Sequence, residues 1–306
     1  MPTQYDVVIV GGSNAGLSAA LILGRARRKV LIVDSQQPRN APAQHAHGFF
    51  TQDGTPPDQL RELGKAQLEP YDVDIQYGLV TNISGENLAF SLTLDTGEVI
   101  NAHKVILATG VQDDTSILPG LSELWGARAY TCPYCHGWEV RDQPLAVITS
   151  GQEAYPYASF LTNWSQRLTV CTNSGELDSE ARGKLTQQHN LTIIDTPITQ
   201  LSASKTEASV QFSDTTELTV QGIFVRPPMR LTAASLLTQL GCTLSECGSY
   251  VVTDDSGQTT IPGVYAVGDM ASPGHAVILA AASGAQAAYM LNHHFVSEQQ
   301  ALSLAS

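Results

Sequence analysis

The chain has 306 residues, of which 42% are hydrophobic and 15% are charged. This length suits two domains of ordinary size with substantial cores, which excludes a disordered protein. The formal net charge of −13 argues against nucleic acid as a partner, because phosphate binding needs clustered Lys and Arg side chains.

Sequence patterns exclude two further classes of protein. The longest apolar runs are broken well short of the ~18 residues that a membrane-spanning helix needs. The first residues lack the basic stretch and apolar segment of a secretory signal. We therefore predict no membrane partner and a cytoplasmic location. Five cysteines, an odd number, do not indicate a structural disulfide framework in such a chain.

The first forty residues have the pattern of a βαβ unit. An apolar run at 7–10 predicts a buried strand, a Gly-rich turn follows at 11–16, and after a helix a second strand at 30–33 ends at Asp34. Such a turn presents backbone N–H groups to a pyrophosphate, and the carboxylate suits ribose hydroxyls. Because Ser13 replaces the middle glycine of G-x-G-x-x-G, this turn alone leaves an unrelated glycine turn open.

The rest of the chain divides into three stretches. Residues 35–60 are rich in loops, and residues 76–110 predict short strands with a turn at 95–97. Near Asp113 we expect a change of domain, and residues 144–225 have a second, weaker β-α-β pattern. From about 230 the first pattern resumes, with an Ala-rich helix at about 276–293 and a tail from Asn292 that we expect to fray.

Three segments together carry a family resemblance. The Gly-rich turn, Ala108-Thr109-Gly110 after a buried strand, and 265–269 with its final Gly-Asp are similar to the three-part pattern of the two-dinucleotide-binding-domain flavoproteins. The resemblance covers nearly the whole chain. It implies an α/β fold of two nested dinucleotide-binding (Rossmann-like) domains, with an FAD domain split into 1–113 and 229–306 around an inserted domain at 114–228.

The same resemblance implies FAD and the residues that contact it. The Asp269 carboxylate would hold the ribitol, and the loop at 45–50 would pass the isoalloxazine, with Phe49 or Phe50 either on the ring or in the core. No metal site is assigned, because His45 and His47 have an indifferent spacing for a metal ion. The positions assigned to FAD are Gly11, Gly12, Ser13, Ala15, Gly16, Asp34, Arg39, Asn40, His47, Thr109, Gly110, Gly268, Asp269, Ala276 and Val277.

The segment Cys132-Pro133-Tyr134-Cys135-His136-Gly137 predicts redox chemistry. Two cysteines three positions apart can close a disulfide at a helix start, where the helix N-terminus lowers the pKa of one thiol. His136 has an intrinsic pKa suited to moving protons. A zinc site would want a second close pair, and Cys242 and Cys247 match it too loosely. A glutaredoxin-like site fits the mid-chain position less well, and a purely structural pair would be unusual next to His and Gly in a loop.

These residues resemble the low-molecular-weight thioredoxin reductases, whose pattern is C-x-x-C-D-G with the Asp as acid–base. Here His136 takes that place, and the C-x-x-C-H-G-aromatic-E form, with Trp138 and Glu139, is similar to dithiol oxidases of the gliotoxin and holomycin type. The resemblance implies a homodimer in which Cys135 faces the flavin C4a and Cys132 meets the substrate. The other cysteines are expected to be buried apolar residues: Cys171, Cys242 and Cys247.

The inserted domain departs from the thioredoxin reductase pattern where NADPH would bind. In the loop at 149–157 that corresponds to the family's second Gly-rich loop, only Gly151 and Ala154 survive. The family's His-Arg-Arg cluster for the 2′-phosphate corresponds to 172–176, where Glu176 would repel a phosphate. We predict that NADPH binds poorly or not at all; the alternative is a diverged site that uses backbone N–H groups alone.

Three functions agree with these residues. The first is an FAD-dependent thiol–disulfide oxidoreductase of the thioredoxin reductase type, which exchanges electrons with a thioredoxin-like protein or a small disulfide without NADPH. The second is an oxygen-dependent oxidase of a small dithiol. The third is a non-catalytic flavin redox sensor, against which the intact C-x-x-C-H sequence argues.

Overall fold

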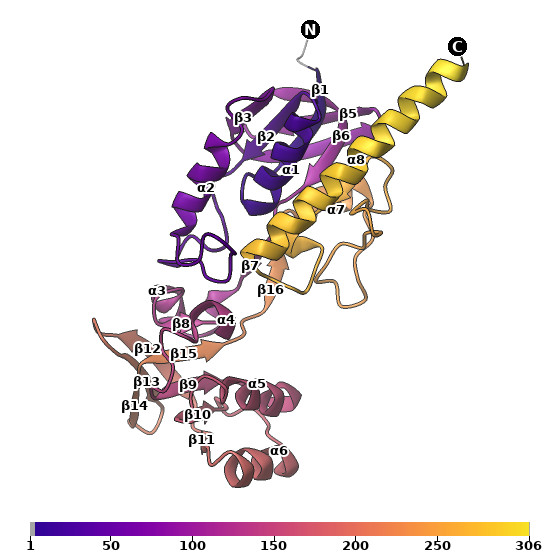
Figure 1. Cartoon of the computed structure of the whole chain (residues 1–306). Coiled ribbons are helices and arrows are strands. Elements are labelled where there is room, and N and C mark those ends of the chain that lie inside the picture. The colour runs from indigo at the N-terminus through magenta and orange to yellow at the C-terminus, as the bar shows by residue number, and fades with distance from the viewer. Residues whose placement is uncertain (1–3, 306) are drawn as a thin grey trace. The chain divides into compact units, whose positions relative to one another are not determined.

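The computed structural model describes residues 4–305, with the side chains of 4–298 and 300, and divides the chain into two compact units. Unit 1 consists of Met1–Ala41, Gly48–Gln112 and Met229–Ser306, and unit 2 of Pro42–His47 and Asp113–Pro228. Each unit is built on a sheet with parallel strands at its centre and helices beside it (Figure 1). The predicted α/β fold class is confirmed.

The sheet of unit 1 has seven strands in the order β3-β2-β1-β6-β5-β4, with β17 also paired to β6. Strands β1, β2, β3, β6 and β17 run parallel, whereas β4 and β5 are antiparallel to their neighbours. The strands are β1 (Gln4–Val10), β2 (Val30–Asp34), β3 (Val73–Tyr77), β4 (Val80–Glu86), β5 (Ala89–Leu94), β6 (Val99–Leu107) and β17 (Val264–Ala266).

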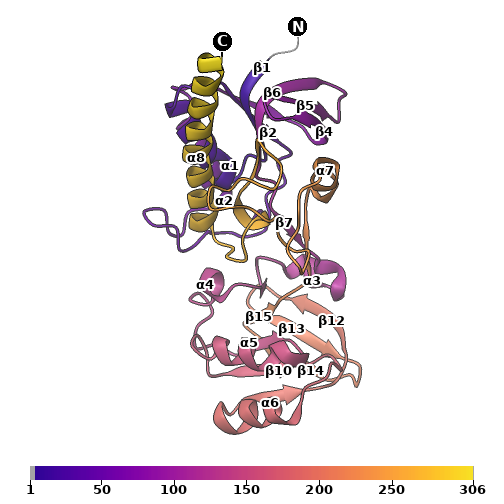
Figure 2. The ribbon, with the colours of Figure 1, turned by 90° about the vertical axis from the view of Figure 1, so that its right-hand side faces the viewer.

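Both faces of this sheet are covered, which explains why its parallel strands are continuous apolar runs. The helices are α1 (Asn14–Arg25), α2 (Pro57–Ala66), α7 (Ala234–Leu240) and α8 (Val277–Ala305), with a 3₁₀ turn at Gly268–Met270. Helices α1 and α8 lie side by side (Figure 2). Small residues permit this approach, because a Cβ at Gly284 would lie 2.1 Å from the carbonyl oxygen of Ala15.

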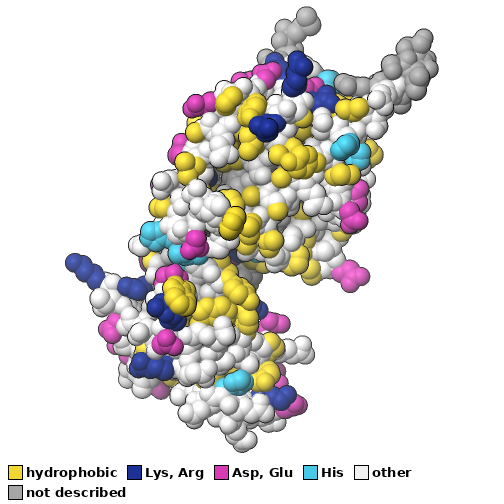
Figure 3. Space-filling view, in the orientation of Figure 1, with side chains coloured by type: hydrophobic (Ala, Val, Ile, Leu, Met, Phe, Trp, Pro, Cys, Tyr) yellow, Lys and Arg dark blue, Asp and Glu magenta, His cyan; other side chains and the backbone are white. Residues whose placement is uncertain are grey.

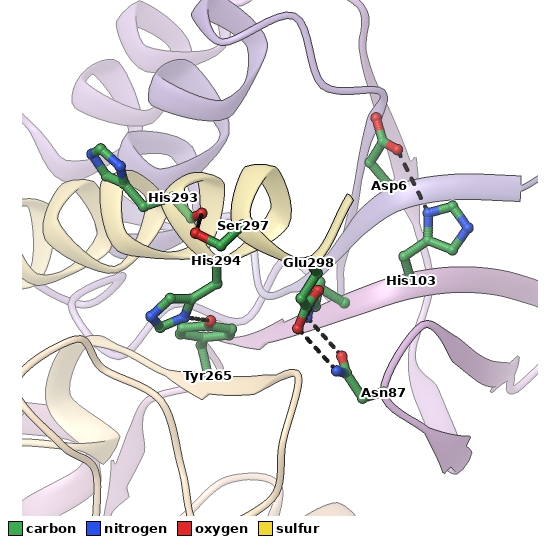
Figure 4. A network of polar contacts seen from close by, with 9 residues as sticks. Asp6, Asn87, His103, Tyr265, His293, His294, Ser297 and Glu298 are labelled. Atoms are coloured by element: carbon green, nitrogen blue, oxygen red, sulfur yellow. Dashed lines mark hydrogen bonds and ion pairs between the residues drawn. The ribbon is translucent and has the colours of Figure 1, made fainter. Parts of the chain in front are cut away.

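Helix α8 is longer than the sequence predicts, since it continues to Ala305 rather than ending near His293. The hydroxyl of Tyr265 lies 2.6 Å from Nδ1 of His294, and the Glu298 carboxylate accepts a hydrogen bond from Asn87 (Figure 4). Lys104, only 1% exposed, also binds Glu298 at 2.7 Å. The expected fraying from Asn292 was wrong, because these polar anchors hold turns that lie beyond the Ala-rich pattern. No helix within residues 4–305 is long and apolar enough to cross a membrane.

Unit 2 has a five-stranded parallel sheet in the order β11-β10-β9-β15-β8 and a three-stranded antiparallel sheet β12-β13-β14. The strands are β8 (Ala129–Tyr130), β9 (Leu145–Ile148), β10 (Leu168–Cys171), β11 (Thr192–Ile194), β12 (Ile198–Ala203), β13 (Ala208–Phe212), β14 (Glu217–Val220) and β15 (Gly222–Val225). The weaker β-α-β pattern read from the sequence is therefore correct.

Short helices connect the strands of unit 2. They are α3 (Leu121–Leu124), α4 (Pro133–His136), α5 (Ala154–Leu161) and α6 (Ser179–Gly183), with 3₁₀ turns at Thr115–Ile117 and Gly151–Glu153 and a π-helical turn at Lys184–Gln188. Strands β7 (Val111–Asp113) and β16 (Met229–Leu231) pair with each other where the chain leaves unit 1 and returns to it.

Candidate functional site

The Gly-rich turn between β1 and α1 has no space for a side chain at Gly11 or Gly16. A Cβ at Gly16 would lie 1.9 Å from the carbonyl oxygen of Gly11, and Gly11 itself has a φ of +111°, which disfavours any side chain. The N-cap of α1, Ser13, makes no side-chain cap hydrogen bond in the described chain. The first N–H groups of α1 therefore lack a side-chain cap and carry the positive end of the helix dipole, which favours a phosphate.

Asp34 lies at the end of β2, directly beside this turn. A Cβ at Gly12 would lie 2.8 Å from the carboxyl carbon of Asp34, so the backbone and the carboxylate are in close approach. Asp34 Oδ1 also accepts a hydrogen bond from the backbone N–H of Gln36 at 3.2 Å. The turn and the carboxylate fit the pyrophosphate and ribose of a dinucleotide such as FAD.

The other residues assigned to FAD in unit 1 follow neighbouring parallel strands. Thr109 and Gly110 follow β6, and Asp269 follows β17, so they lie at the same edge of the sheet. Asp269 Oδ2 accepts a hydrogen bond from the Arg39 guanidinium at 3.0 Å, a pairing that the sequence did not reveal. Asn40 is half-buried in the turn beside Arg39. Ala276 and Val277 stand at the start of α8.

One position assigned to FAD lies in the other unit. His47 belongs to unit 2, where its Nε2 lies 3.5 Å from Oε1 of Glu139. Of the two aromatic residues nearby, Phe49 is half-buried and Phe50 is 82% exposed, so Phe50 does not anchor the loop in a core. All other FAD positions lie in unit 1.

The cysteine pair forms the predicted disulfide at the start of a short helix in unit 2. Cys132 and Cys135 are bonded, with their Cα atoms 5.3 Å apart. Cys132 is the N-cap of α4, and Pro133 follows at the first helical position, where its missing N–H costs no hydrogen bond. The backbone N–H groups of Cys135 and His136 both donate to the carbonyl of Cys132, which fixes the turn.

His136 is enclosed beside this disulfide. Its ring stacks on Tyr130 with a centroid separation of 4.4 Å and an interplanar angle of 17°. Both ring nitrogens are buried, and neither has a hydrogen-bond partner among the described residues. Burial lowers the pKa of His136 from 6.5 to about 4, while the charge of Glu139 opposes this shift and His47 adds to it. At neutral pH the imidazole is therefore uncharged and able to accept a proton.

Exposed aromatic rings gather at the disulfide segment, and sequence reasoning assigned them no role. Tyr134, between the two cysteines, is 73% exposed and packs against Phe160 and Trp164 at centroid distances of 5.7 and 5.3 Å. Trp138 is 65% exposed and lies under the guanidinium of Arg141 at 3.9 Å. Phe160 and Trp164 lie some thirty residues downstream, so only the fold reveals this cluster.

The remaining cysteines differ in exposure. Cys171 is buried as expected, Cys242 is partly exposed, and Cys247 is exposed, so the expectation of burial was wrong for Cys247, which lies in a Ser- and Gly-rich turn at 245–249. Hydrogen bonds from Ser245 and Ser249 lower the pKa of the Cys247 thiol to about 7. Among the described residues, no group of three or more His, Cys, Asp or Glu side chains could hold a metal ion.

The loops that follow β9 and β10 in unit 2 bind each other. The backbone N–H of Gly151, after β9, donates to the carbonyl of Glu176, after β10, at 2.5 Å. A Cβ at Gly175 would lie 2.4 Å from the Ser150 side chain, which shows how closely the loops approach. The two loops therefore occupy the carboxyl edge of the sheet themselves.

Two cations at this edge have carboxylate partners within unit 2. Arg182 pairs with Asp195 at 2.8 Å, and Asp195 also accepts a hydrogen bond from the Thr172 hydroxyl. Arg226, directly after β15, pairs with Glu153 at 3.4 Å and lies 4.0 Å from the centre of the Tyr157 ring. Glu153 and Glu176 add negative charge where the sequence pattern of the family would place phosphates.

Comparison with known proteins agrees with this arrangement. Residues 5–288 match the family described as pyridine nucleotide-disulphide oxidoreductase. Thioredoxin reductase sirT of Leptosphaeria maculans is 30% identical over 309 residues, which cover 95% of this chain and 94% of that protein. The thioredoxin reductase of Treponema pallidum is 30% identical over 310 residues, which cover 94% and 96%.

Solved structures extend the likeness over the whole fold. The crystal structure of HlmI is 36% identical with a TM-score of 0.93 and covers 100% of this chain and 97% of its own. An oxidoreductase from Agrobacterium tumefaciens is 36% identical with a TM-score of 0.90 and covers 96% and 99%. The chain therefore belongs to the pyridine nucleotide-disulphide oxidoreductase family, as a thioredoxin reductase-like, FAD-dependent disulfide oxidoreductase.

Proposed function

We propose that the enzyme exchanges electrons between FAD and a substrate dithiol or disulfide through Cys132 and Cys135, and that it does not use NADPH. The observation that carries the proposal is the closed loop edge of unit 2, where the N–H of Gly151 is bonded to the carbonyl of Glu176. A nucleotide pyrophosphate needs free backbone N–H groups between the first strand and the helix that follows it. Here the carbonyl of Glu176 already accepts a hydrogen bond from the first of these N–H groups, that of Gly151.

The charged residues of unit 2 also argue against NADPH binding. Residues 172–176 contain no Lys or Arg to hold a 2′-phosphate. Recruiting Arg182 or Arg226 would break their ion pairs with Asp195 and Glu153. A phosphate would then lie close to unpaired carboxylates, which repel it.

The residues of unit 1 would hold FAD, which when bound supplies a carrier of two electrons. The backbone of Gly11, Gly12 and the first turn of α1 would bind the pyrophosphate, and Asp34 would bind the adenosine ribose. Asp269, kept in place by Arg39, would hold the ribitol.

Thiol–disulfide exchange accounts for the chemistry of unit 2. A substrate thiolate attacks Cys132 Sγ, a substrate–Cys132 disulfide forms as the Cys132–Cys135 bond breaks, and the electron pair leaves on Cys135 as a thiolate. The second substrate thiolate then attacks the sulfur of the substrate in this mixed disulfide. This releases a substrate disulfide and the Cys132 thiolate, so that two electrons now reside in the cysteine pair. His136 accepts a proton from an attacking thiol, and the reverse sequence reduces a disulfide.

Two observations favour the oxidase direction as a second candidate. An uncharged His136 can remove a proton from an entering thiol, which a protonated imidazole could not do. The exposed rings of Tyr134 and Phe160, which pack with the half-buried Trp164, suit a small apolar dithiol rather than a highly charged one. In this direction molecular oxygen would take the two electrons and two protons and leave as hydrogen peroxide.

Anaerobic reduction of the flavin-loaded protein tests the proposal. We expect the flavin absorbance to bleach with dithiothreitol but not with NADPH or NADH. Rapid bleaching by NADPH would contradict the proposal that loop contacts at the carboxyl edge of unit 2 prevent nucleotide binding. After bleaching by dithiol, admission of oxygen separates the candidates: fast recovery of the yellow colour indicates an oxidase, and slow recovery a reductase with another donor. Failure of every dithiol and disulfide to turn over would favour the redox sensor.

We further propose that the chain forms a homodimer through α8. This helix exposes a row of apolar side chains, and apolar side chains are visible on this part of the surface in Figure 3. The exposed members are Ile278, Leu279, Tyr289, Met290 and Val296. Monomeric proteins rarely leave such a face uncovered. Light scattering should give twice the mass of one chain, and Tyr289→Lys should shift the mass toward one chain without loss of helix content; a monomeric wild-type protein would refute the proposal.

A further inference from the structure

Glu139 has no part in the exchange chemistry described above, yet it lies in the same unit and the same turn of chain as the groups that perform it. It follows His136 by three residues, one turn past the end of α4. Its Oε1 lies 3.5 Å from Nε2 of His47, a residue more than ninety positions earlier in the chain. Both residues belong to unit 2, together with the disulfide. The Glu139 side chain is 43% exposed.

The surroundings of His136 favour its uncharged form. Its stacking on Tyr130 and the burial of both nitrogens remove the water that would stabilise an imidazolium. Among the described groups that act on it, Glu139 is the one that favours the protonated ring, while His47, when protonated, disfavours it. Burial raises the pKa of Tyr130, with Arg128 lowering it and Glu139 raising it further.

We propose that Glu139 is a positioning residue of the disulfide site: it holds His47 by an ion pair and stabilises the charged His136 that forms when the ring takes a proton from a thiol. The inference rests on the exchange function proposed above. In that function, Glu139 would offset the energetic cost of charging the buried His136.

The Glu139 carboxylate would stabilise His136 during the interval in which the ring holds the proton of the thiol. When a thiol S–H loses its proton to His136, a thiolate and an imidazolium form from two neutral groups. The thiolate bonds to Cys132, and the imidazolium gives its proton to the Cys135 thiolate that leaves, so no net proton is lost in the step. Without Glu139, the imidazolium would form in a buried site with no compensating charge. The contact of Oε1 with Nε2 of His47 at 3.5 Å restrains the carboxylate.

A measurement independent of turnover tests the coupling itself. The C–H resonance of His136, followed against pH in histidine-labelled protein, should titrate at a lower pH in Glu139→Gln than in the wild type. Glu139→Asp should fall between the two, because it keeps the charge but moves it. An unchanged titration in Glu139→Gln would overturn the proposal, whatever reaction the enzyme performs.

The rate of anaerobic flavin reduction by dithiothreitol tests the consequence. We expect Glu139→Gln to slow this step about tenfold at pH 7, to shift the acid limb of its pH profile to lower pH, and to leave the FAD content unchanged; Glu139→Asp should recover most of the rate. Glu217→Gln, which removes one exposed carboxylate from β14 of the same unit, is the matched control and should behave as the wild type. A Glu139→Gln protein with the wild-type rate and profile would contradict the proposal. A wild-type protein that no dithiol reduces would instead contradict the proposed function, and the His136 titration would still decide the role of Glu139.

Discussion

Cys135→Ser is expected to lower turnover with any dithiol by at least about 1000-fold while the protein keeps its FAD. Exchange through a disulfide needs both sulfurs, because the second one receives the electron pair when the first is attacked. The remaining Cys132 should still form a mixed disulfide with a small disulfide reagent, and with no neighbouring thiol to resolve it this adduct should persist. Mass spectrometry of the intact protein after treatment with such a reagent would detect it.

The assignment of the two cysteines is tested by the opposite variant. Cys132→Ser should lose turnover equally but should not accumulate an adduct on Cys135, since the family resemblance implies that Cys135 faces the flavin. The experiment needs a Cys247→Ser background, because Cys247 is exposed and its pKa of about 7 makes it reactive by itself. A stable adduct on Cys135 would reverse the roles of the two sulfurs. Undiminished turnover in either single variant would show that the Cys132–Cys135 disulfide takes no part in the reaction.

Gly16→Ala is expected to abolish FAD binding. A methyl group there would lie 1.9 Å from the carbonyl oxygen of Gly11, and this contact is with backbone rather than with a flexible side chain. The turn would have to open, which costs about 1–3 kcal/mol or more and moves the N–H groups that would bind the pyrophosphate. The purified protein should be colourless, and its melting temperature should not rise when FAD is added.

A second glycine provides the control for this substitution. Gly183, at the end of α6, has an ordinary backbone conformation, and a methyl group added there would meet no atom within 4 Å. Gly183→Ala should therefore leave flavin content unchanged and stability equal or slightly higher. Normal flavin content in Gly16→Ala would show that this turn does not hold the cofactor.

The sequence was sufficient wherever a local pattern is tied to a backbone requirement. The continuous apolar run of β1, the glycines after it and the carboxylate at the end of β2 belong to one βαβ unit, and together with the downstream segments their spacing predicted the geometry of the turn. The disulfide between Cys132 and Cys135 was predictable for the same reason, because three positions at a helix start bring two sulfurs together.

Contacts between distant segments could not be read in this way. The pairing of Arg39 with Asp269 joins positions 230 residues apart, and the aromatic cluster around Tyr134 depends on how α5 packs in unit 2. Glu139 was visible in the motif, but its contact with His47 was not, because the sequence does not show that the loop at 42–47 joins unit 2. The last turns of α8 were missed because Lys104 and Tyr265, which anchor them, lie on other elements.

At the carboxyl edge of the unit 2 sheet, the sequence and the structure contribute different observations. The sequence indicates that the glycines and arginines of the family's NADPH site are absent from this chain. The structure adds a positive feature, since Glu176 and Gly151 are bonded to each other and Arg226 is paired with Glu153. A nucleotide would have to displace these contacts rather than merely do without the usual ones.

The most direct measurement compares two rate constants on one preparation. The flavin-loaded protein is mixed without oxygen with NADPH and, separately, with dithiothreitol, and flavin absorbance is followed on the millisecond to minute timescale. We predict reduction by dithiothreitol that disappears in Cys132→Ser and Cys135→Ser, and no reduction by NADPH above the drift of the protein alone. Reduction by NADPH faster than by the dithiol would contradict the account and would make the enzyme an NADPH-dependent disulfide reductase.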